Sequence, residues 1–125
     1  MVQTFPAAER IKSRTVLETV YEKGEQIIVH PFRIRFMRYN FEEGAAVKFA
    51  VSVPKRNVKK AVRRNRLKRQ IKEAYRLNKK GLLSQINDPS QGLALFLIYI
   101  GKDDQTYQAL EDKMKLLLDK LQQKL

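Results

Sequence analysis

Two short segments alternate strictly between apolar and other side chains, and this pattern constrains the fold more than any other feature of the chain. Its apolar members are Phe32, Ile34, Phe36, Val47, Phe49, Val51 and Val53. The intervening positions include Arg33, Arg35, Lys48, Ala50 and Ser52. Because successive side chains of a strand point to opposite faces, the pattern predicts two strands with one core face and one basic face. The basic face can hold an extended phosphate backbone or can simply face solvent, and the pattern favours neither.

Periodicities elsewhere predict the elements that surround these strands. Helices are expected over about residues 13–23, 59–78 and 106–125, and further strands over 26–29 and 93–100. The last of these strands is apolar without alternation, as expected when both faces are covered. Residues 40–44 are expected to form a turn, and residues 79–92, with their Gly and Pro breakers, an irregular segment. The order α-β-β-β-α-β-α predicts an α+β fold in one domain, residues 1–125, with a single layer of helices on a mixed four-stranded sheet.

Positive charge is concentrated in one part of the chain. The 125 residues carry a formal net charge of +13, and 13 of the 26 Lys and Arg residues lie between Pro54 and Lys80 with one acid, Glu73. Crowded like charges oppose folding unless a polyanion neutralises them. A solvated helix face is the alternative, but the near absence of acids favours a nucleic-acid surface.

The composition argues against several other classes of protein. The chain has no cysteine and one histidine, His30, and its carboxylates are scattered, so we assign no catalytic residue and no metal ligand to it. The longest apolar run, at 93–100, is too short to span a bilayer, and the first ten residues lack a signal-peptide pattern. We therefore expect a cytoplasmic protein with no membrane partner.

The predicted helix over 59–78 has two different sides when its residues are placed at 100° intervals. Leu67, Ile71 and Ala74 fall on one side, with Tyr75 at the edge. Asn65, Arg69, Lys72 and Arg76 form a stripe on the opposite side, flanked by Arg66. Such a row of cations suits phosphates along a backbone. Val58, Ala61 and Val62 do not fit the apolar side, so the first turn either packs differently or begins later.

The motif at the start of this helix resembles that of a known family. Residues 49–56 read Phe-Ala-Val-Ser-Val-Pro-Lys-Arg, and residues 60–69 contain Arg64-Asn65-Arg66. This combination resembles the protein component of bacterial ribonuclease P, whose hallmark is an Arg-Asn-Arg motif after a strand. The segment from Leu17 to Gly24 is similar to the family's first helix. The resemblance also implies a left-handed β-α-β crossover, as in ribosomal protein S5 domain 2-like folds, which pattern reading does not predict.

The resemblance implies a function and two surfaces. The chain would be the subunit of ribonuclease P that binds the catalytic RNA subunit and the 5′ leader of precursor tRNA, and so assists endonucleolytic 5′ maturation. The RNA-binding residues expected from the motif and the stripe are Arg56, Arg64, Asn65, Arg66, Lys68, Arg69, Lys72 and Arg76. The leader cleft is expected to contain Leu17, Tyr21, Arg33, Arg35, Lys48 and Ser52. Arg33 and Arg35 stand where relatives carry apolar or aromatic residues, which favours phosphate pairing over base stacking.

The resemblance also implies that RNA, not this chain, performs the hydrolysis. No cofactor is then bound by the protein alone, and Mg²⁺ is used by the RNA–protein holoenzyme. The alternative from composition is a basic ribosomal protein that binds ribosomal RNA structurally. A DNA-binding module is disfavoured, because no helix-turn-helix or heptad-linked basic region is present.

Overall fold

The alternating segments form the two strands expected from them, within a four-stranded sheet. The computed structural model describes residues 7–102 and 105–125. The strands are β1 (Glu25–Val29), β2 (Phe32–Tyr39), β3 (Val47–Ser52) and β4 (Gly92–Tyr99), in the order β1-β2-β4-β3. β1 and β4 are antiparallel to β2, whereas β3 is parallel to β4. The expected mixed four-stranded sheet of an α+β fold is confirmed.

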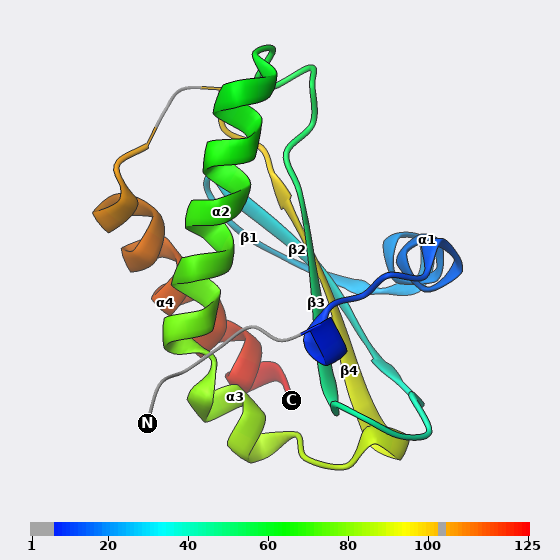
Figure 1. The fold of residues 1–125 in the computed structure, drawn as a ribbon. Coiled ribbons are helices and arrows are strands. Elements are labelled where there is room, and N and C mark those ends of the chain that lie inside the picture. Colours follow the sequence, from blue (N-terminus) through cyan, green and yellow to red (C-terminus); the bar gives the residue numbers. More distant parts are fainter. Residues whose placement is uncertain (1–6, 103–104) are drawn as a thin grey trace.

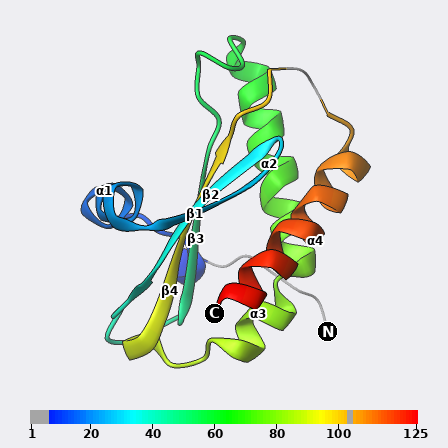
Figure 2. The same ribbon diagram turned by 180° about the vertical axis from the view of Figure 1, so that it is seen from behind.

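The helices lie on both faces of this sheet. They are α1 (Arg14–Lys23), α2 (Ala61–Asn78), α3 (Lys80–Gln85) and α4 (Tyr107–Lys124). Figures 1 and 2 show α2, α3 and α4 together on one face and α1 alone on the other. The expected layer of helices therefore consists of α2–α4. The helix α1 departs from it because its buried Val20 packs with Ala94 on the outward face of β4, apart from the main core.

The connection from β3 through α2 to β4 joins two parallel neighbours. In Figure 1 both strands run upward, the helices lie to the left and β3 stands in front of β4, so the crossover is left-handed. This agrees with the crossover that the family resemblance implies.

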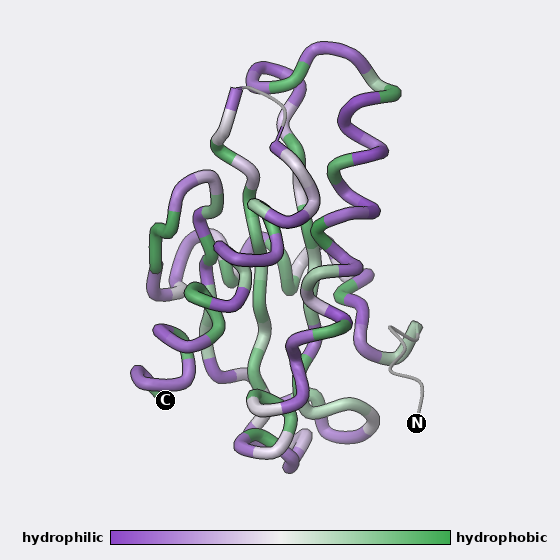
Figure 3. Tube along the Cα trace, turned by 90° about the vertical axis from the view of Figure 1, so that its left-hand side faces the viewer, coloured by the Kyte–Doolittle hydropathy of each residue, from purple (hydrophilic) through white to green (hydrophobic). Residues whose placement is uncertain are grey.

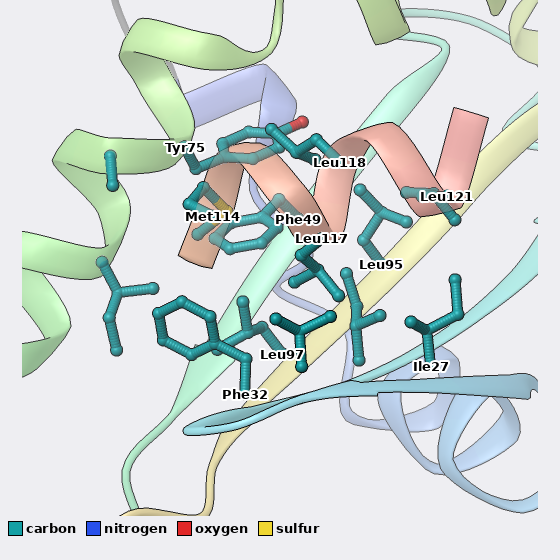
Figure 4. Close-up of a cluster of buried hydrophobic side chains, with 14 of the residues drawn as sticks. Ile27, Phe32, Phe49, Tyr75, Leu95, Leu97, Met114, Leu117, Leu118 and Leu121 are labelled. Atoms are coloured by element: carbon teal, nitrogen blue, oxygen red, sulfur yellow. The ribbon is translucent and has the colours of Figure 1, made fainter. Parts of the chain in front are cut away.

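The main core lies between the sheet and the α2–α4 layer. Figure 4 shows its labelled side chains, Ile27, Phe32, Phe49, Tyr75, Leu95, Leu97, Met114, Leu117, Leu118 and Leu121. The Phe49 and Tyr75 rings stack with centroids 4.0 Å apart and planes 3° apart, which joins β3 to α2. The tube in Figure 3 is hydrophobic along the central strands and mostly hydrophilic along the outer helices.

Two local expectations change in the structure. The helix α2 begins at Ala61, so Val58 is buried in the loop before it, whereas Ala61 and Val62 are exposed. The first helical turn therefore begins later than the expected residue 59, which is one of the two alternatives that the sequence left open. Residues 79–92 are not irregular throughout, because they contain α3 and a short 3-10 helix, Pro89–Gln91. Gly81 does not break the helix: a Cβ there would lie 3.1 Å from the Gln122 side chain, so glycine permits α3 to approach α4.

The segment before α1 covers the outer edge of β3. Arg10 forms a bridge with Phe49, and the Ile11 N–H donates to the Phe49 carbonyl at 3.2 Å. Glu9, just upstream, accepts a hydrogen bond at 2.8 Å from the Lys79 ammonium, which is buried near the end of α2. This buried ion pair ties the start of the chain to the helix layer.

The substitution Glu9→Gln tests this link. It removes the negative charge that faces the buried Lys79 ammonium, so the free energy of unfolding should fall by about 3 kcal/mol. Glu18→Gln is the matched control, because it breaks the exposed Arg14–Glu18 pair and should cost under about 0.5 kcal/mol. Urea unfolding measures both variants, and equal losses would contradict a stabilising buried pair.

Candidate nucleic-acid interface

The exposed side of α2 carries the predicted cationic stripe. Leu67, Ile71, Ala74 and Tyr75 are buried against the sheet, as the helical angles predict. A shallow hollow on the opposite side is lined by Val62, Asn65, Lys68, Arg69 and Lys72. The structure thus brings together four of the predicted RNA-binding residues, Asn65, Lys68, Arg69 and Lys72. The exposed Val62 is an apolar member that charge counting could not single out.

Arg64 has a different position from the other two residues of the Arg-Asn-Arg motif. Its guanidinium donates to the carbonyls of Val58 and Lys59 at 3.1 and 2.6 Å, and the side chain is half-buried. Arg64 therefore holds the loop that leads from β3 into α2. Asn65 and Arg66 are exposed beside it.

Arg56 and Arg76, the first and last of the predicted RNA-binding residues, have different surroundings. Arg56 is exposed in the turn before α2, where Asn57 fixes the loop by donating to the Tyr99 carbonyl at 2.9 Å. Arg76, at the far end of the stripe, pairs with Glu73, to which its Nε donates at 3.2 Å. The hydrogen bond from Arg76 lowers the pKa of Glu73, which keeps this carboxylate charged. The cationic stripe is therefore partly neutralised at Arg76.

A second candidate surface is a groove between α1 and the outward face of β4. It is lined by Arg14, Leu17, Glu18, Tyr21, Glu22 and Phe96. The Tyr21 side chain is 50% exposed, and its ring lies 6.5 Å from that of Phe96 at an angle of 57°. Leu17 and Tyr21 thus meet as predicted, and Phe96 is a groove residue that the sequence analysis missed. Its position on the same strand face as Ala94 and Ile98 could have indicated this, but residues 93–100 are all apolar apart from Tyr99 and contain no glycine, so the sequence pattern did not separate the two faces of the strand.

The two arginines predicted for the cleft have different surroundings. Arg35 donates to Gln26 Oε1 at 3.2 Å and to the Tyr21 carbonyl, and its guanidinium carbon lies 5.5 Å from the centre of the Tyr21 ring. Arg33 is half-buried one row further along the sheet, between Ile28 and Ile98. Within the described part of the chain its Nε is buried without a hydrogen-bond partner, as is the Nε of Arg35. The two are therefore not equivalent, although both lie on the predicted face.

Lys48 and Ser52 lie on the same sheet face but do not line this groove. The Lys48 ammonium sits 4.7 Å from the centre of the Phe41 ring and borders a separate hollow with Arg10 and Lys12. Ser52 is the neighbour of Ile98, in the same row as Arg33. The single cleft expected from sequence is thus distributed over three neighbouring places.

Acidic side chains are few near the α2 stripe, and no metal-binding cluster is found in the described ranges. Among residues 7–102 and 105–125, no three His, Asp or Glu side chains gather closely enough to hold a metal ion. In the same ranges, no helix has the length and apolar character needed to cross a membrane.

Fold and site together define a class: small basic α+β proteins with a left-handed β-α-β crossover and a cationic helix facing away from the sheet. The family model described as Ribonuclease P matches residues 5–122. The chain belongs to this family, and so to the protein subunits of an endoribonuclease, ribonuclease P.

Individual relatives agree with this assignment. The chain is 34% identical over 97 residues to a protein named ribonuclease P protein component from Porphyromonas gingivalis, covering 78% of this chain and 70% of that protein. A protein of the same name from Coxiella burnetii is 34% identical over 82 residues, 66% of this chain and 65% of its own length.

Solved structures show the same fold. The ribonuclease P protein of Staphylococcus aureus superposes with a TM-score of 0.65 at 25% identity, covering 89% of this chain and 93% of that one. That of Thermotoga maritima gives a TM-score of 0.70 at 22% identity, covering 90% and 96% of the two chains.

The unequal pairing of the stripe residues leads to a prediction for RNA binding. Arg69→Ala should weaken binding to the ribonuclease P RNA and reduce the slope of log K against log salt by up to about 0.9, one lost phosphate contact. Arg76→Ala is the matched control on the same helix and should act less, because Glu73 already neutralises this side chain. Filter binding across a salt series measures both, and equal slopes for the two variants would contradict this difference.

Proposed function

We propose that this chain assists ribonuclease P by binding two RNAs on opposite faces of its sheet. The exposed side of α2 binds the catalytic RNA subunit, and the groove beside α1 binds the single-stranded 5′ leader of precursor tRNA. Endonucleolytic removal of the leader then proceeds with the substrate held by the protein. This proposal rests on family membership and on the placement of α1 alone on the face opposite α2 (Figures 1 and 2).

The single observation that carries the proposal is the exposed cationic stripe on a helix anchored by the core. Asn65, Lys68, Arg69 and Lys72 lie on one exposed face, whereas the acid of this helix, Glu73, pairs with Arg76. A row of cations replaces counterions along an RNA backbone, and the release of those counterions drives binding. Asn65 adds an amide that can contact a base edge or a ribose hydroxyl.

The groove supports a different kind of contact. Tyr21 and Phe96 offer aromatic surface to a base, and stacking of this kind tolerates any sequence. Glu18 and Glu22 stand on the helix side of the groove, so phosphates should run along the sheet side, toward Arg33 in the neighbouring row. The sequence analysis expected phosphate pairing in place of base stacking in this cleft. We infer instead that both contacts are available, because Phe96 supplies an aromatic surface from β4.

The proposal assigns the hydrolysis and its magnesium to RNA. The described residues fit a magnesium site on this chain poorly, because magnesium prefers oxygen donors. On the α2 face Asn65 supplies an amide oxygen, while Lys68, Arg69 and Lys72 are cations. The alternative of a structural ribosomal protein has no support among the relatives found, which are named ribonuclease P protein component.

The activity of the separate and combined components tests the proposal. The protein alone should not cleave precursor tRNA. Added to its RNA subunit with magnesium, it should permit cleavage at low ionic strength where the RNA alone is slow, because its cations replace part of the counterions that hold two RNAs together. Cleavage by RNA-free protein that persists through repurification would falsify this assignment, and so would failure to stimulate the RNA.

The aromatic pair of the groove gives a separate prediction. Tyr21→Leu and Phe96→Leu keep apolar bulk but remove the rings, so each should weaken precursor tRNA relative to mature tRNA by about 1 kcal/mol with little salt dependence. Leu116→Ala is the control, because it removes an exposed apolar side chain from α4 on the other face. The measurement is the ratio of precursor to mature tRNA affinity in the assembled enzyme. An unchanged ratio in both leucine variants would remove the stacking surface from the proposal.

A further inference from the structure

The guanidinium of Arg35 joins three parts of the groove. It donates to the Gln26 side chain on β1 and to the backbone carbonyl of Tyr21 on α1, and it lies over the Tyr21 ring. We propose that Arg35 is a positioning residue that fixes α1 and the Tyr21 ring for leader recognition, and that Arg33, rather than Arg35, provides a phosphate contact of this face. This inference rests on the proposed leader groove and assigns separate tasks to the two arginines within it.

The geometry leaves Arg35 poorly placed for a phosphate. An arginine binds phosphate best when both ends of its fork point at the same oxyanion. Here one terminal nitrogen of Arg35 is directed at Gln26 and the other at the Tyr21 carbonyl. A phosphate that engaged both ends of the fork would compete with these two acceptors.

The contact with the Tyr21 carbonyl stabilises the end of α1. The last four carbonyls of a helix have no intrahelical donor, and a cation near them interacts favourably with the helix dipole. Tyr21 is in the last turn of α1, which ends at Lys23. Arg35 therefore supplies from the sheet a donor that α1 lacks, and so fixes the orientation of this short helix.

The Arg35 guanidinium also contacts the Tyr21 ring and so restricts its position. A half-exposed tyrosine on a helix surface can change rotamer easily. The Arg35 guanidinium, 5.5 Å from the ring centre, and the Phe96 ring, 6.5 Å away, restrict the positions open to this ring. The ring is thus held in position before RNA arrives, which lowers the entropy lost on binding.

Arg33 has the properties that Arg35 lacks. It is on the same strand face by period two, one row beyond the part of the sheet that α1 covers. Its Nε has no hydrogen-bond partner in the described residues, and its neighbours in the row are Ile28, Ile98 and Ser52, none of which takes the place that Gln26 and the Tyr21 carbonyl have beside Arg35. Its fork can therefore meet a phosphate without breaking another contact.

The experiment compares Arg35→Lys, Arg35→Gln and Arg33→Gln in the assembled enzyme. Affinity for precursor tRNA with a long and with a very short leader is measured over a salt series, alone and with Tyr21→Leu. Arg38→Gln is the matched control, since it removes the same charge from the same strand at an exposed position outside the groove. Binding to the RNA subunit through α2 and the circular dichroism spectrum show whether each variant is folded.

Arg33→Gln should reduce the salt slope for the long leader by about 0.7, one phosphate contact on a single strand. Arg35→Gln should weaken the long leader about tenfold at an unchanged slope, and this loss should largely vanish beside Tyr21→Leu. Arg35→Lys keeps the charge but cannot span both acceptors, so it should behave like Arg35→Gln.

Two results would overturn the inference while the proposed function stands. One is a reduced salt slope in Arg35→Gln with recovery in Arg35→Lys, which identifies a phosphate contact. The other is a loss in Arg35→Gln that is unchanged by Tyr21→Leu, which separates the arginine from the ring. If the unaltered enzyme shows no preference for the long leader, the leader groove itself is wrong. A variant that unfolds would show that Arg35 stabilises the fold and would refute a role confined to the groove.

Discussion

The burial of one apolar side of α2 is the contact on which the rest of this structure depends. This helix carries seven Lys and Arg residues and one acid, so its charges repel one another in the absence of a partner. Leu67, Ile71, Ala74 and Tyr75 bind it to the sheet, and each fully buried large side chain contributes about 1.5–3 kcal/mol. Burial also raises the pKa of the Tyr75 hydroxyl, which stays neutral where it stacks on Phe49. The core thereby holds a surface of cations in place at a cost that bound RNA would offset.

The central strand β4 is what allows a small chain to have two separate surfaces. Leu95 and Leu97 face the α2–α4 layer, and Ala94 and Phe96 face α1. The small Ala94 lets Val20 of α1 approach the sheet closely, whereas Phe96 fills the space beside it and stays partly exposed. A strand covered on both faces therefore contributes to the core and to the groove at once. Since the sheet lies between them, the α2 face and the groove are separate surfaces, as the proposed binding of two RNAs requires.

The charges of the two surfaces are arranged differently. On α2 the cations are adjacent in sequence and share a side of one helix, so a simple angular projection locates them. At the groove, Glu18 and Glu22 come from α1, whereas Arg35 beside it and Arg33 in the next row come from β2, so the local balance depends on how a helix crosses a strand. This is why the stripe was predicted almost completely, while the cleft residues separated into a groove, a neighbouring row and the hollow near Lys48.

Local periodicity determined most of the elements and the cationic side of α2, because burial of one face is set by the spacing of apolar residues along the chain. It also located α1 to within one residue, because the helix expected over about residues 13–23 runs from Arg14 to Lys23. Tertiary structure decided which face of the sheet α1 covers, that Phe96 enters the groove, and that α3 forms beside Gln122 despite Gly81. It also decided that Arg35 contacts Gln26 of β1 and the Tyr21 carbonyl of α1. These outcomes depend on contacts between residues far apart in sequence, and a side chain's spacing along its own element carries no information about the partner that another element brings to it.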